Sequence, residues 1–367
     1  MNSMNESPVT ISQVAECAGV SVGTVSRVLN QASNVALENQ EKVQRAIEEL
    51  GYKKKTFSGP SASRRNGATP RSGNIGLIFA DAGTEWISHP LNMAYTSGVE
   101  SACEENGYHS LVEFAPADGS VPRCVREGKV DGVLIKVARQ VPDFIKDIPP
   151  DMPMVLVGLN APWVDLPQVS LDNYGAGWMV TKYLWERGHR RIGFLCSKGS
   201  HPLFVERMQG SIAFLRSRQA YTPDLVVAES SAQEISAQFL SEPQTSPPDM
   251  TEAFDQLMTQ ASKSPPTALV MANDWMARGM YDVLARRGLR VPQDISVVGF
   301  DNVALLCSSM SPQLTSFDLN FGAVVRAAAL DLFDVIKAPH TKRDLSIRLV
   351  RGHLVERDSV SDVAAFG

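Results

Sequence analysis

Apolar residues near the start of the chain recur every three to four positions in three short segments, the spacing of amphipathic helices. These positions are Val14 and Ala15 in the first segment, Val25, Val28 and Leu29 in the second, and Val43, Ala46, Ile47 and Leu50 in the third. Thr10 and Gln13 form a capping box that starts the first helix, and Gly19 ends it. Ser21 caps the second helix, and Gly51 supplies a left-handed stop for the third. Three such helices close a small core.

From residue 74 onward the pattern changes to short continuous apolar runs separated by helical segments, one of them near Leu91–Asn106. The runs are Ile75–Phe79, Ser110–Phe114, Gly132–Val137, Met154–Gly158, Arg191–Cys196, Leu225–Ala228, Ala268–Met271 and Ser296–Gly299. This alternation predicts an α/β fold with doubly wound parallel sheets, which bind ligands beyond the carboxyl ends of their strands. Trp178 and Trp185 are seven positions apart on one helix and are expected in the core or an interface.

Residues 56–73 join the two patterns and are rich in Ser, Gly and Pro without an apolar period. We predict a flexible linker there. No leucine heptad follows Arg351, so the sequence favours a dimer over a tetramer, and Val355–Gly367 is expected to be frayed.

Charge is distributed unevenly along the chain. The net charge is −5, but residues 1–73 hold nine Lys/Arg against six Glu. The cluster Lys53–Lys55 directly follows the third helix. Cations at that place either meet DNA phosphates, releasing counterions, or form a solvated charge run that ends a helix.

The five cysteines lack paired spacing, and reduced, buried thiols are expected rather than disulfides or metal ligands; they are Cys17, Cys103, Cys124, Cys196 and Cys307. No Cys/His cluster has the spacing of a metal site, and no cofactor is predicted. The N-terminus carries no signal segment and no apolar run is long enough to span a membrane, so we expect a cytoplasmic protein.

The first two helices carry a specific motif. Residues 14–30 read Val-Ala-x-x-Ala-Gly-Val-Ser-x-x-Thr-Val-Ser-Arg-Val-Leu-Asn, and residues 49–52 read Glu-Leu-Gly-Tyr. This run resembles the DNA-binding headpiece of the lactose/galactose repressor family. The resemblance implies a helix-turn-helix domain, which we place at residues 8–55, whose second helix enters the major groove.

The same resemblance assigns base reading to Val22, Gly23 and Arg27. It assigns phosphate contacts to Ser21, Thr24, Ser26 and Asn30, and Tyr52 and Lys53 complete the predicted DNA-binding set. Arg27 can donate a fork to a guanine edge. Val22 either touches a thymine methyl or packs locally, and Gly23 only permits close approach. Direct readout therefore depends heavily on Arg27.

The linker departs from the family pattern. Members usually continue into an Asn-x-x-Ala-Arg-x-Leu hinge helix whose leucine enters the minor groove, and residues 56–73 do not match it. Arg64 and Arg65 as a disordered arm, or Phe57 as a wedge, are alternatives to a solvated linker, which we favour.

Motifs of the large domain are similar to the family's effector-binding domain, which is built like type I periplasmic sugar-binding proteins. They are Val130-Asp-Gly-Val-Leu, Leu171-Asp-Asn, Arg187-Gly-His-Arg-Arg-Ile, Arg207-x-x-Gly, Ala272-Asn-Asp and Leu289-Arg-Val-Pro-Gln-Asp-Ile-Ser-Val-Val-Gly-Phe-Asp. The resemblance implies a two-lobed domain, here at residues 74–358, with chain crossovers near Leu171–Asn173, Gly299–Asn302 and Ser316–Leu319. It also implies a homodimer that reads a palindromic operator in double-stranded DNA.

Arg207, Asn273 and Asp301 match positions that hold the effector in the family. Arginine and aspartate can each contact adjacent sugar hydroxyls at two points. Each residue has a structural alternative: an ion pair for Arg207, a helix cap for Asn273 and a turn cap for Asp301. Further candidates lie in loops after strands or beside them: Trp86, Trp163 and Phe204 for stacking, and His89 and Asn160 for hydrogen bonds. Trp275 is left open between ligand contact and packing.

We therefore predict a ligand-responsive, sequence-specific transcriptional regulator of the repressor type, with a sugar or related small metabolite as effector. The alternative is a solute-binding receptor, which the large domain alone would suggest. An enzyme is not expected, because no nucleophile elbow, phosphate loop or metal signature is present.

Overall fold

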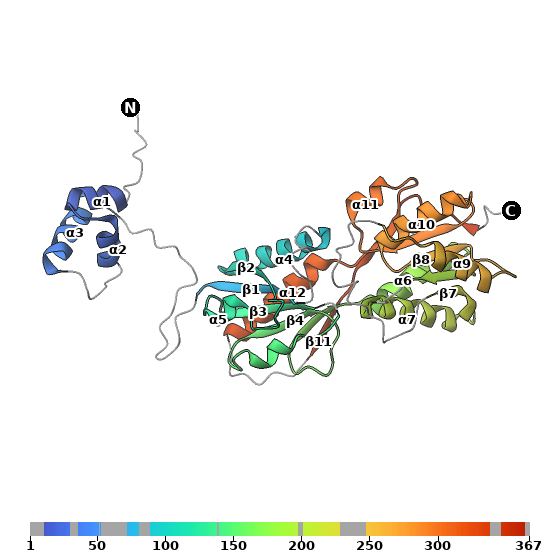
Figure 1. The fold of residues 1–367 in the computed structure, drawn as a ribbon, viewed down its shortest axis with the longest axis horizontal. Helices are drawn as coiled ribbons and strands as arrows, with labels where there is room; N and C mark the ends of the chain where they lie inside the picture. The colour runs from blue at the N-terminus through green and yellow to red at the C-terminus, as the bar shows by residue number, and fades with distance from the viewer. Residues whose placement is uncertain are drawn as a thin grey trace, which may run out of the picture. The chain divides into compact units, whose positions relative to one another are not determined.

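The computed structural model describes residues 11–29, 36–50, 52, 72–80, 89–137, 139–196, 201–227, 247–337 and 346–363. The chain divides into two compact units, residues 1–59 and residues 60–367 (Figure 1). We call them the headpiece and the body and describe each by itself. Thr10, Gly51 and the predicted linker up to residue 71 lie outside the described residues.

The headpiece contains the three predicted helices: α1 (Ile11–Ala18), α2 (Val22–Leu29) and α3 (Leu37–Leu50). Its core contains apolar residues from every helix: Val14, Ala15, Ala18, Val25, Val43 and Ala46. Gly19 ends α1 at a positive φ of 63°, where a side chain would be strained. The Ser21 hydroxyl accepts the Thr24 N–H at 3.1 Å, which caps α2. The predictions for Gly19 and Ser21 are confirmed.

The body contains two six-stranded sheets, each with helices packed against it. The first has the order β11-β5-β4-β3-β1-β2 and the second β12-β10-β9-β8-β6-β7. Every described strand pair is parallel except β10 with β12. The predicted α/β architecture is confirmed.

The first lobe is built from β1 (Asn74–Phe79), α4 (Pro90–Asn106), β2 (His109–Phe114), α5 (Arg123–Arg126), β3 (Gly132–Val137), η2 (Asp143–Asp147), β4 (Met154–Gly158), β5 (Gln168–Leu171), α12 (Phe321–Lys337) and β11 (Ile347–Val350). The second lobe is built from α6 (Asn173–Glu186), β6 (Ile192–Leu195), α7 (Pro202–Ser217), η3 (Pro223–Leu225), β7 (Val226–Val227), α9 (Thr251–Gln260), β8 (Ala268–Met271), α10 (Asp274–Arg286), β9 (Ser296–Phe300), α11 (Ala304–Ser309), β10 (Thr315–Asp318) and β12 (His353–Val355).

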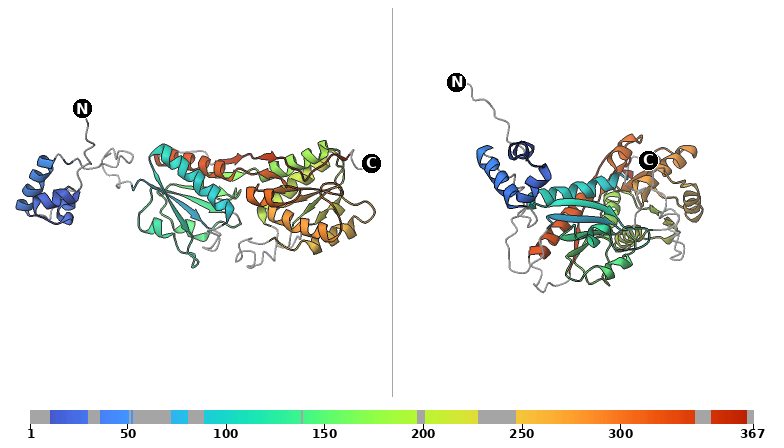
Figure 2. Two further views of the ribbon diagram at one scale, coloured as in Figure 1. Left: turned by 90° about the horizontal axis from the view of Figure 1, so that it is seen from above. Right: turned by 60° about the vertical axis from the view of Figure 1, so that its left-hand side comes forward.

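Helix α12 shows that the lobes are discontinuous in sequence. It follows β10 of the second lobe, yet it lies beside α4 of the first lobe (Figure 2). The two helices approach each other so closely that a Cβ on Gly98 would lie 2.3 Å from the Gly322 carbonyl oxygen. Tyr95 and Phe321 contact each other with ring centroids 5.5 Å apart. Residues 321–337 and 347–350, which follow β10 of the second lobe in sequence, therefore complete the first lobe.

The chain crosses between lobes at three places, and one prediction was wrong. Crossings at Asp172 and at residues 319–320 agree with the predicted Leu171–Asn173 and Ser316–Leu319. At Gly299–Asn302 the chain stays in the second lobe, because β9, α11 and β10 all belong there. The third crossing lies at Arg351–Gly352, between β11 and β12.

The three crossings touch one another. The Asp172 N–H donates to the Val350 carbonyl oxygen at 3.0 Å, and Arg351 Nε lies 3.4 Å from Asp172 Oδ2. Gly352 passes the Asp318 backbone so closely that a Cβ there would lie 1.9 Å from the Asp318 carbonyl oxygen. Glycine at residue 352 is required by this approach.

The expectation that Val355–Gly367 is frayed was wrong for its described part. Ser359 is fully buried. Its hydroxyl donates to the Val297 carbonyl oxygen and accepts the Thr315 N–H, and its own carbonyl oxygen accepts the Val297 N–H. Farther on, the Ser361 carbonyl oxygen lies 3.0 Å from Nε2 of His189, whose Nδ1 lies 2.9 Å from Thr267 Oγ1. Because a carbonyl only accepts, Nε2 carries the proton and Nδ1 accepts from Thr267. A buried neutral histidine thus holds the C-terminal segment on the second lobe.

All five cysteines are free thiols, as predicted, but Cys17 is exposed on α1 rather than buried. The helical period of α1 places Cys17 beside the apolar stripe and not within it. Its thiol therefore lies 3.9 Å from a Glu49 carboxylate oxygen and does not enter the core. No helix within the described ranges is long and apolar enough to cross a membrane. The same ranges contain no group of three His, Cys, Asp or Glu side chains placed to hold a metal ion.

We expect the stability of the body to fall as the pH drops below about 6.5, the pKa of an unfolded histidine. Burial lowers the pKa of His189, so the unfolded chain binds the proton more tightly and the stabilisation present at neutral pH is lost toward acid. Unfolding midpoints measured between pH 5 and 8 check this. His189→Gln should show a shallower pH dependence, and an equally steep one would contradict this role of His189.

Replacing Gly352 with Ala should destabilise the body by about 1–3 kcal/mol, the usual cost of overpacking. The new Cβ would collide with the Asp318 carbonyl and with the ring of the buried Phe317, and a backbone carbonyl cannot move aside as a flexible side chain can. Denaturant unfolding measures the change. A midpoint equal to that of the unsubstituted chain would show that the crossings separate easily.

Candidate functional site

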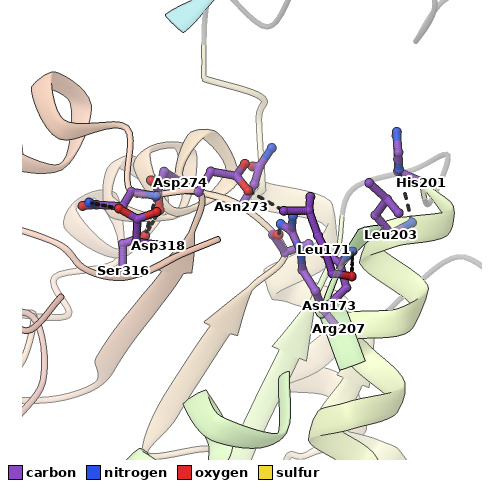
Figure 3. Close-up of polar contacts among 12 residues, drawn as sticks. Leu171, Asn173, His201, Leu203, Arg207, Asn273, Asp274, Ser316 and Asp318 are labelled. Carbon is purple, nitrogen blue, oxygen red and sulfur yellow. Dashed lines mark hydrogen bonds and ion pairs between the residues drawn. The ribbon is translucent and has the colours of Figure 1, made fainter. Parts of the chain in front are cut away.

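Arg207 on α7 occupies the centre of the predicted effector site. Its guanidinium is only 2% exposed and uses all three nitrogens within the protein (Figure 3). Nε donates to Asn173 Oδ1 at 3.0 Å, Nη1 donates to the Ala272 carbonyl oxygen at 2.6 Å, and Nη2 lies 3.0 Å from Asp301 Oδ1. The side chain therefore joins the starts of α6 and α10 to the end of β9.

Two aromatic rings flank the same guanidinium. The centroids of Phe204 and Phe300 each lie 5.1 Å from the Arg207 Cζ. Such rings attract a cation and keep water from it. Phe204, predicted to stack on ligand, is 9% exposed and contacts Arg207.

Asp301 directly follows β9 and has a positive φ of 95°, which is rare for a residue with a side chain. Its carboxylate is 8% exposed. Burial raises its pKa, and the nearby Arg207 guanidinium opposes that rise. The ion-pair alternative for Arg207 is thus correct, with Asp301 as its partner. Within the described part of the chain, the Asp301 side chain accepts no hydrogen bond from the following turn; Asp274 supplies that contact instead, by accepting the Val303 N–H at 2.8 Å.

Asn273 caps α10, because its Oδ1 accepts the Met276 N–H at 2.9 Å. The next residue, Asp274, is fully buried, and it accepts the Ser316 hydroxyl at 2.6 Å and the Cys307 thiol at 3.2 Å (Figure 3). Burial, followed by the charge of Asp301, raises the pKa of Asp274 to about 7. Asp274 thereby ties α10 to α11 and β10.

Two helices start with the same cap, one in each lobe. His89-Pro90-Leu91 begins α4 and His201-Pro202-Leu203 begins α7. In each, the histidine Nδ1 accepts the leucine N–H, at 3.4 and 3.3 Å. Nδ1 is therefore unprotonated, and the neutral ring carries its proton on Nε2.

The charges around His201 come from both lobes. Burial is the main cause that lowers its pKa well below the usual value, with Arg139, Lys136 and Arg207 adding to it. Burial and Lys136 lower the pKa of His89 to about 4. Both rings are therefore neutral at pH 7, and His201 lies near charged groups of the opposite lobe.

The remaining effector candidates do not share one environment. Asn160 follows β4, and its buried Oδ1 has no hydrogen-bond partner among the described residues. The same holds, within those residues, for the buried Nε1 of Trp275. Trp163 is 72% exposed on a turn, and Trp86 lies outside the described residues. Trp178 and Trp185, predicted as core or interface, both pack edge-on against Phe214.

Sequence reasoning missed three residues of this site: Asn173, His201 and Asp274. Asn173 and Asp274 are each part of a motif quoted above, and an apolar run followed by two polar residues marks the carboxyl end of a strand. The repeated His-Pro-Leu was the available signal for His201.

The headpiece leaves the start of α2 accessible. Val22 is 45% exposed, so the alternative in which it packs locally loses support. Arg27 is exposed, and its Nε donates to the Gly23 carbonyl oxygen at 3.1 Å. Ser21 and Thr24 share a hydroxyl hydrogen bond of 2.9 Å, and Tyr52 is half-buried against the core. The Ser26 side chain, Asn30 and Lys53 lie outside the described residues.

Comparison with known proteins gives two family matches. Residues 10–55 match "Bacterial regulatory proteins, lacI family", and residues 181–360 match "Periplasmic binding protein-like domain". The chain is 31% identical over 362 residues to the HTH-type transcriptional repressor PurR of Pectobacterium carotovorum subsp. carotovorum (strain PC1), covering 96% of this chain and 97% of that protein. It is 29% identical over 346 residues to the repressor CytR of Escherichia coli (strain K12), covering 91% and 92%.

Solved structures show the same architecture. A complex of the transcriptional regulator CelR with cellobiose has a TM-score of 0.62 and 27% identity, covering 96% of this chain and 99% of that one. The lac repressor dimer bound to operator and the anti-inducer ONPF has a TM-score of 0.64 at 23% identity, covering 97% and 100%. The second likeness concerns the fold alone.

Asp301→Asn should destabilise the body by about 3 kcal/mol, because it leaves the Arg207 charge buried without its counter-charge. The control is Asp143→Asn, which removes the partner of Lys146 from an exposed pair and should barely change the unfolding midpoint. Denaturant unfolding of both variants compares them. Equal, small effects would mean that Arg207 does not depend on Asp301.

Proposed function

The chain belongs to the lacI family of bacterial regulatory proteins, and we propose that it represses transcription under the control of a small-molecule effector. The observation that carries this proposal is the buried Arg207–Asp301 pair at the carboxyl end of β9. The same chain has a headpiece in which the start of α2 is exposed and can contact DNA. We propose that it acts in the cytoplasm, where chromosomal DNA is accessible, and that it catalyses no reaction.

The residues at the start of α2 contact the DNA. Its exposed N-terminal end offers backbone N–H groups to phosphate, together with the hydroxyls of Ser21 and Thr24. Val22 contacts a thymine methyl, and Arg27 releases the Gly23 carbonyl to donate to a guanine edge. A homodimer places two such helices on the two halves of a palindromic operator.

The effector is proposed to bind beside Arg207, Asp301 and Asn273, at the carboxyl ends of the strands. The guanidinium and the carboxylate already hold each other in place, so little side-chain freedom is lost on binding. This combination of a fork donor and a twofold acceptor suits adjacent hydroxyls, as in a sugar or related metabolite. Likeness to a regulator solved with cellobiose supports this class.

Coupling runs through the relative movement of the lobes. An effector that contacts groups from both lobes favours the arrangement in which they approach, and only such differential affinity shifts the population. The touching crossings at Asp172, residues 319–320 and Gly352 are the pivot of that movement. The headpiece and the effector domain together favour a regulator over a solute-binding receptor.

Selection of genomic fragments by the full chain, at a stated salt concentration, tests DNA reading. We expect an enriched palindrome. Arg27→Ala should weaken binding to it by about 10- to 100-fold, the value of one good base contact. The matched control is Lys42→Ala, which removes the same charge from a headpiece lysine paired with Glu38. Equal losses in both variants, or recovery without sequence preference, would reject sequence-specific reading by Arg27.

A further inference from the structure

Three exposed arginines of the second lobe differ from six other arginines of that lobe, of which three are exposed and three half-buried. Arg187, Arg191, Arg278, Arg286, Arg287 and Arg290 each form an ion pair with a carboxylate. Arg190, Arg216 and Arg218 are exposed and have no carboxylate partner within the described part of the chain. We call these three residues the arginine platform.

Each platform arginine lies over an aromatic ring, as does Arg187 over Tyr183, but Arg187 also has a carboxylate partner. Arg190 Cζ is 3.9 Å from the Trp185 centroid, Arg218 Cζ is 5.6 Å from Phe214, and Arg216 Cζ is 4.9 Å from Tyr221. Stacking on a ring fixes the plane of a guanidinium while leaving donors at its edge for a partner.

Ring packing joins two of the three arginines, and Arg216 lies two positions from one of them along the chain. Trp185 packs against Phe214 with centroids 6.1 Å apart, which joins the rings under Arg190 and Arg218. Arg216 and Arg218 lie at the end of α7, which packs extensively against α6. Two carbonyls hold one edge of Arg190, because Nη1 donates to Trp185 and His189.

Attraction to the helix dipole does not account for the platform. Helix α10 also ends in arginines, Arg286 and Arg287, yet both are paired with aspartates. Arg190 lies beyond the end of α6 and stacks back on it. Residues 173–218 as a whole contain eight Lys/Arg and two Asp/Glu, although the full chain has a net charge of −5. Positive charge is therefore concentrated in this part of the second lobe.

We propose that the arginine platform docks an acidic segment of a partner protein. Arginine with tryptophan and tyrosine is the composition of strongly contributing residues at protein interfaces, and planar guanidinium groups bind carboxylates through two parallel hydrogen bonds. Three charges are few for a DNA backbone, which proteins usually hold through six to ten phosphate contacts. The segment's carboxylates take the place of the aspartates that accompany the other arginines.

Fluorescence anisotropy with the full chain tests the proposal, using a labelled peptide of alternating Asp and Glu around a central Leu. Its matched control is the same peptide with Asn and Gln. We expect the amide peptide to bind at least about tenfold more weakly, and the variant R190A/R216A/R218A to lose at least about tenfold in affinity for the acidic peptide. R190K/R216K/R218K keeps the charge but loses the planar fork, and should lose affinity partially.

The control variant is R278A/R286A/R287A, which removes the same charge from arginines of α10 that are already paired. It should bind the acidic peptide like the unsubstituted chain. Equal losses in the two triple-alanine variants would reduce the effect to diffuse attraction and overturn the proposal. Equal affinity of the unsubstituted chain for the acidic and the amide peptide would also overturn it. The proposal would fail as well if R190A/R216A/R218A lost as much affinity for a DNA duplex without operator sequence as for the acidic peptide. Unfolding midpoints confirm that each variant is folded.

Discussion

The contact of three chain crossings is the constraint on which the body depends. Asp172 donates to Val350, and Gly352 passes the Asp318 carbonyl without room for a Cβ. Each lobe is thus assembled from separate parts of the sequence, and neither can form before distant segments meet. The crossings also adjoin the proposed effector site, because Asn173 follows the first of them directly and accepts a hydrogen bond from Arg207.

The sequence predicted the elements with a strong period and missed those that bury polar groups. Eight apolar runs correspond to strands, although in Leu225–Ala228 only Val226–Val227 form a strand, Leu225 ends a short helical turn and Ala228 lies outside the described residues. Strands β5 and β10 were not predicted, because Gln168, Ser170, Thr315 and Ser316 interrupt their apolar pattern. These side chains are buried because each finds a partner: Gln168 bonds both the N–H and the carbonyl of Ala161, and Ser316 bonds Asp274.

The proposed effector site shows the same division. Arg207, Asn273 and Asp301 were predicted through the motifs that contain them, but their partners depend on three-dimensional proximity. The Arg207–Asp301 pair joins residues 94 positions apart, which no local pattern shows. Asn273 was weighed as both a cap and a ligand, and its cap is formed. The third crossing at Arg351–Gly352 could not be predicted either, since a single glycine gives no signal of the backbone that it passes.

The cysteines divide the molecule chemically. Four thiols are buried in the body, and burial raises the pKa of Cys103, Cys124 and Cys196 to about 12 and that of Cys307 still further. These thiols stay protonated and shielded, whereas Cys17 is exposed on α1. A maleimide dye added to the folded protein would therefore attach to the headpiece at one position. The chain carries its own labelling site for following operator binding by fluorescence, without any engineered cysteine.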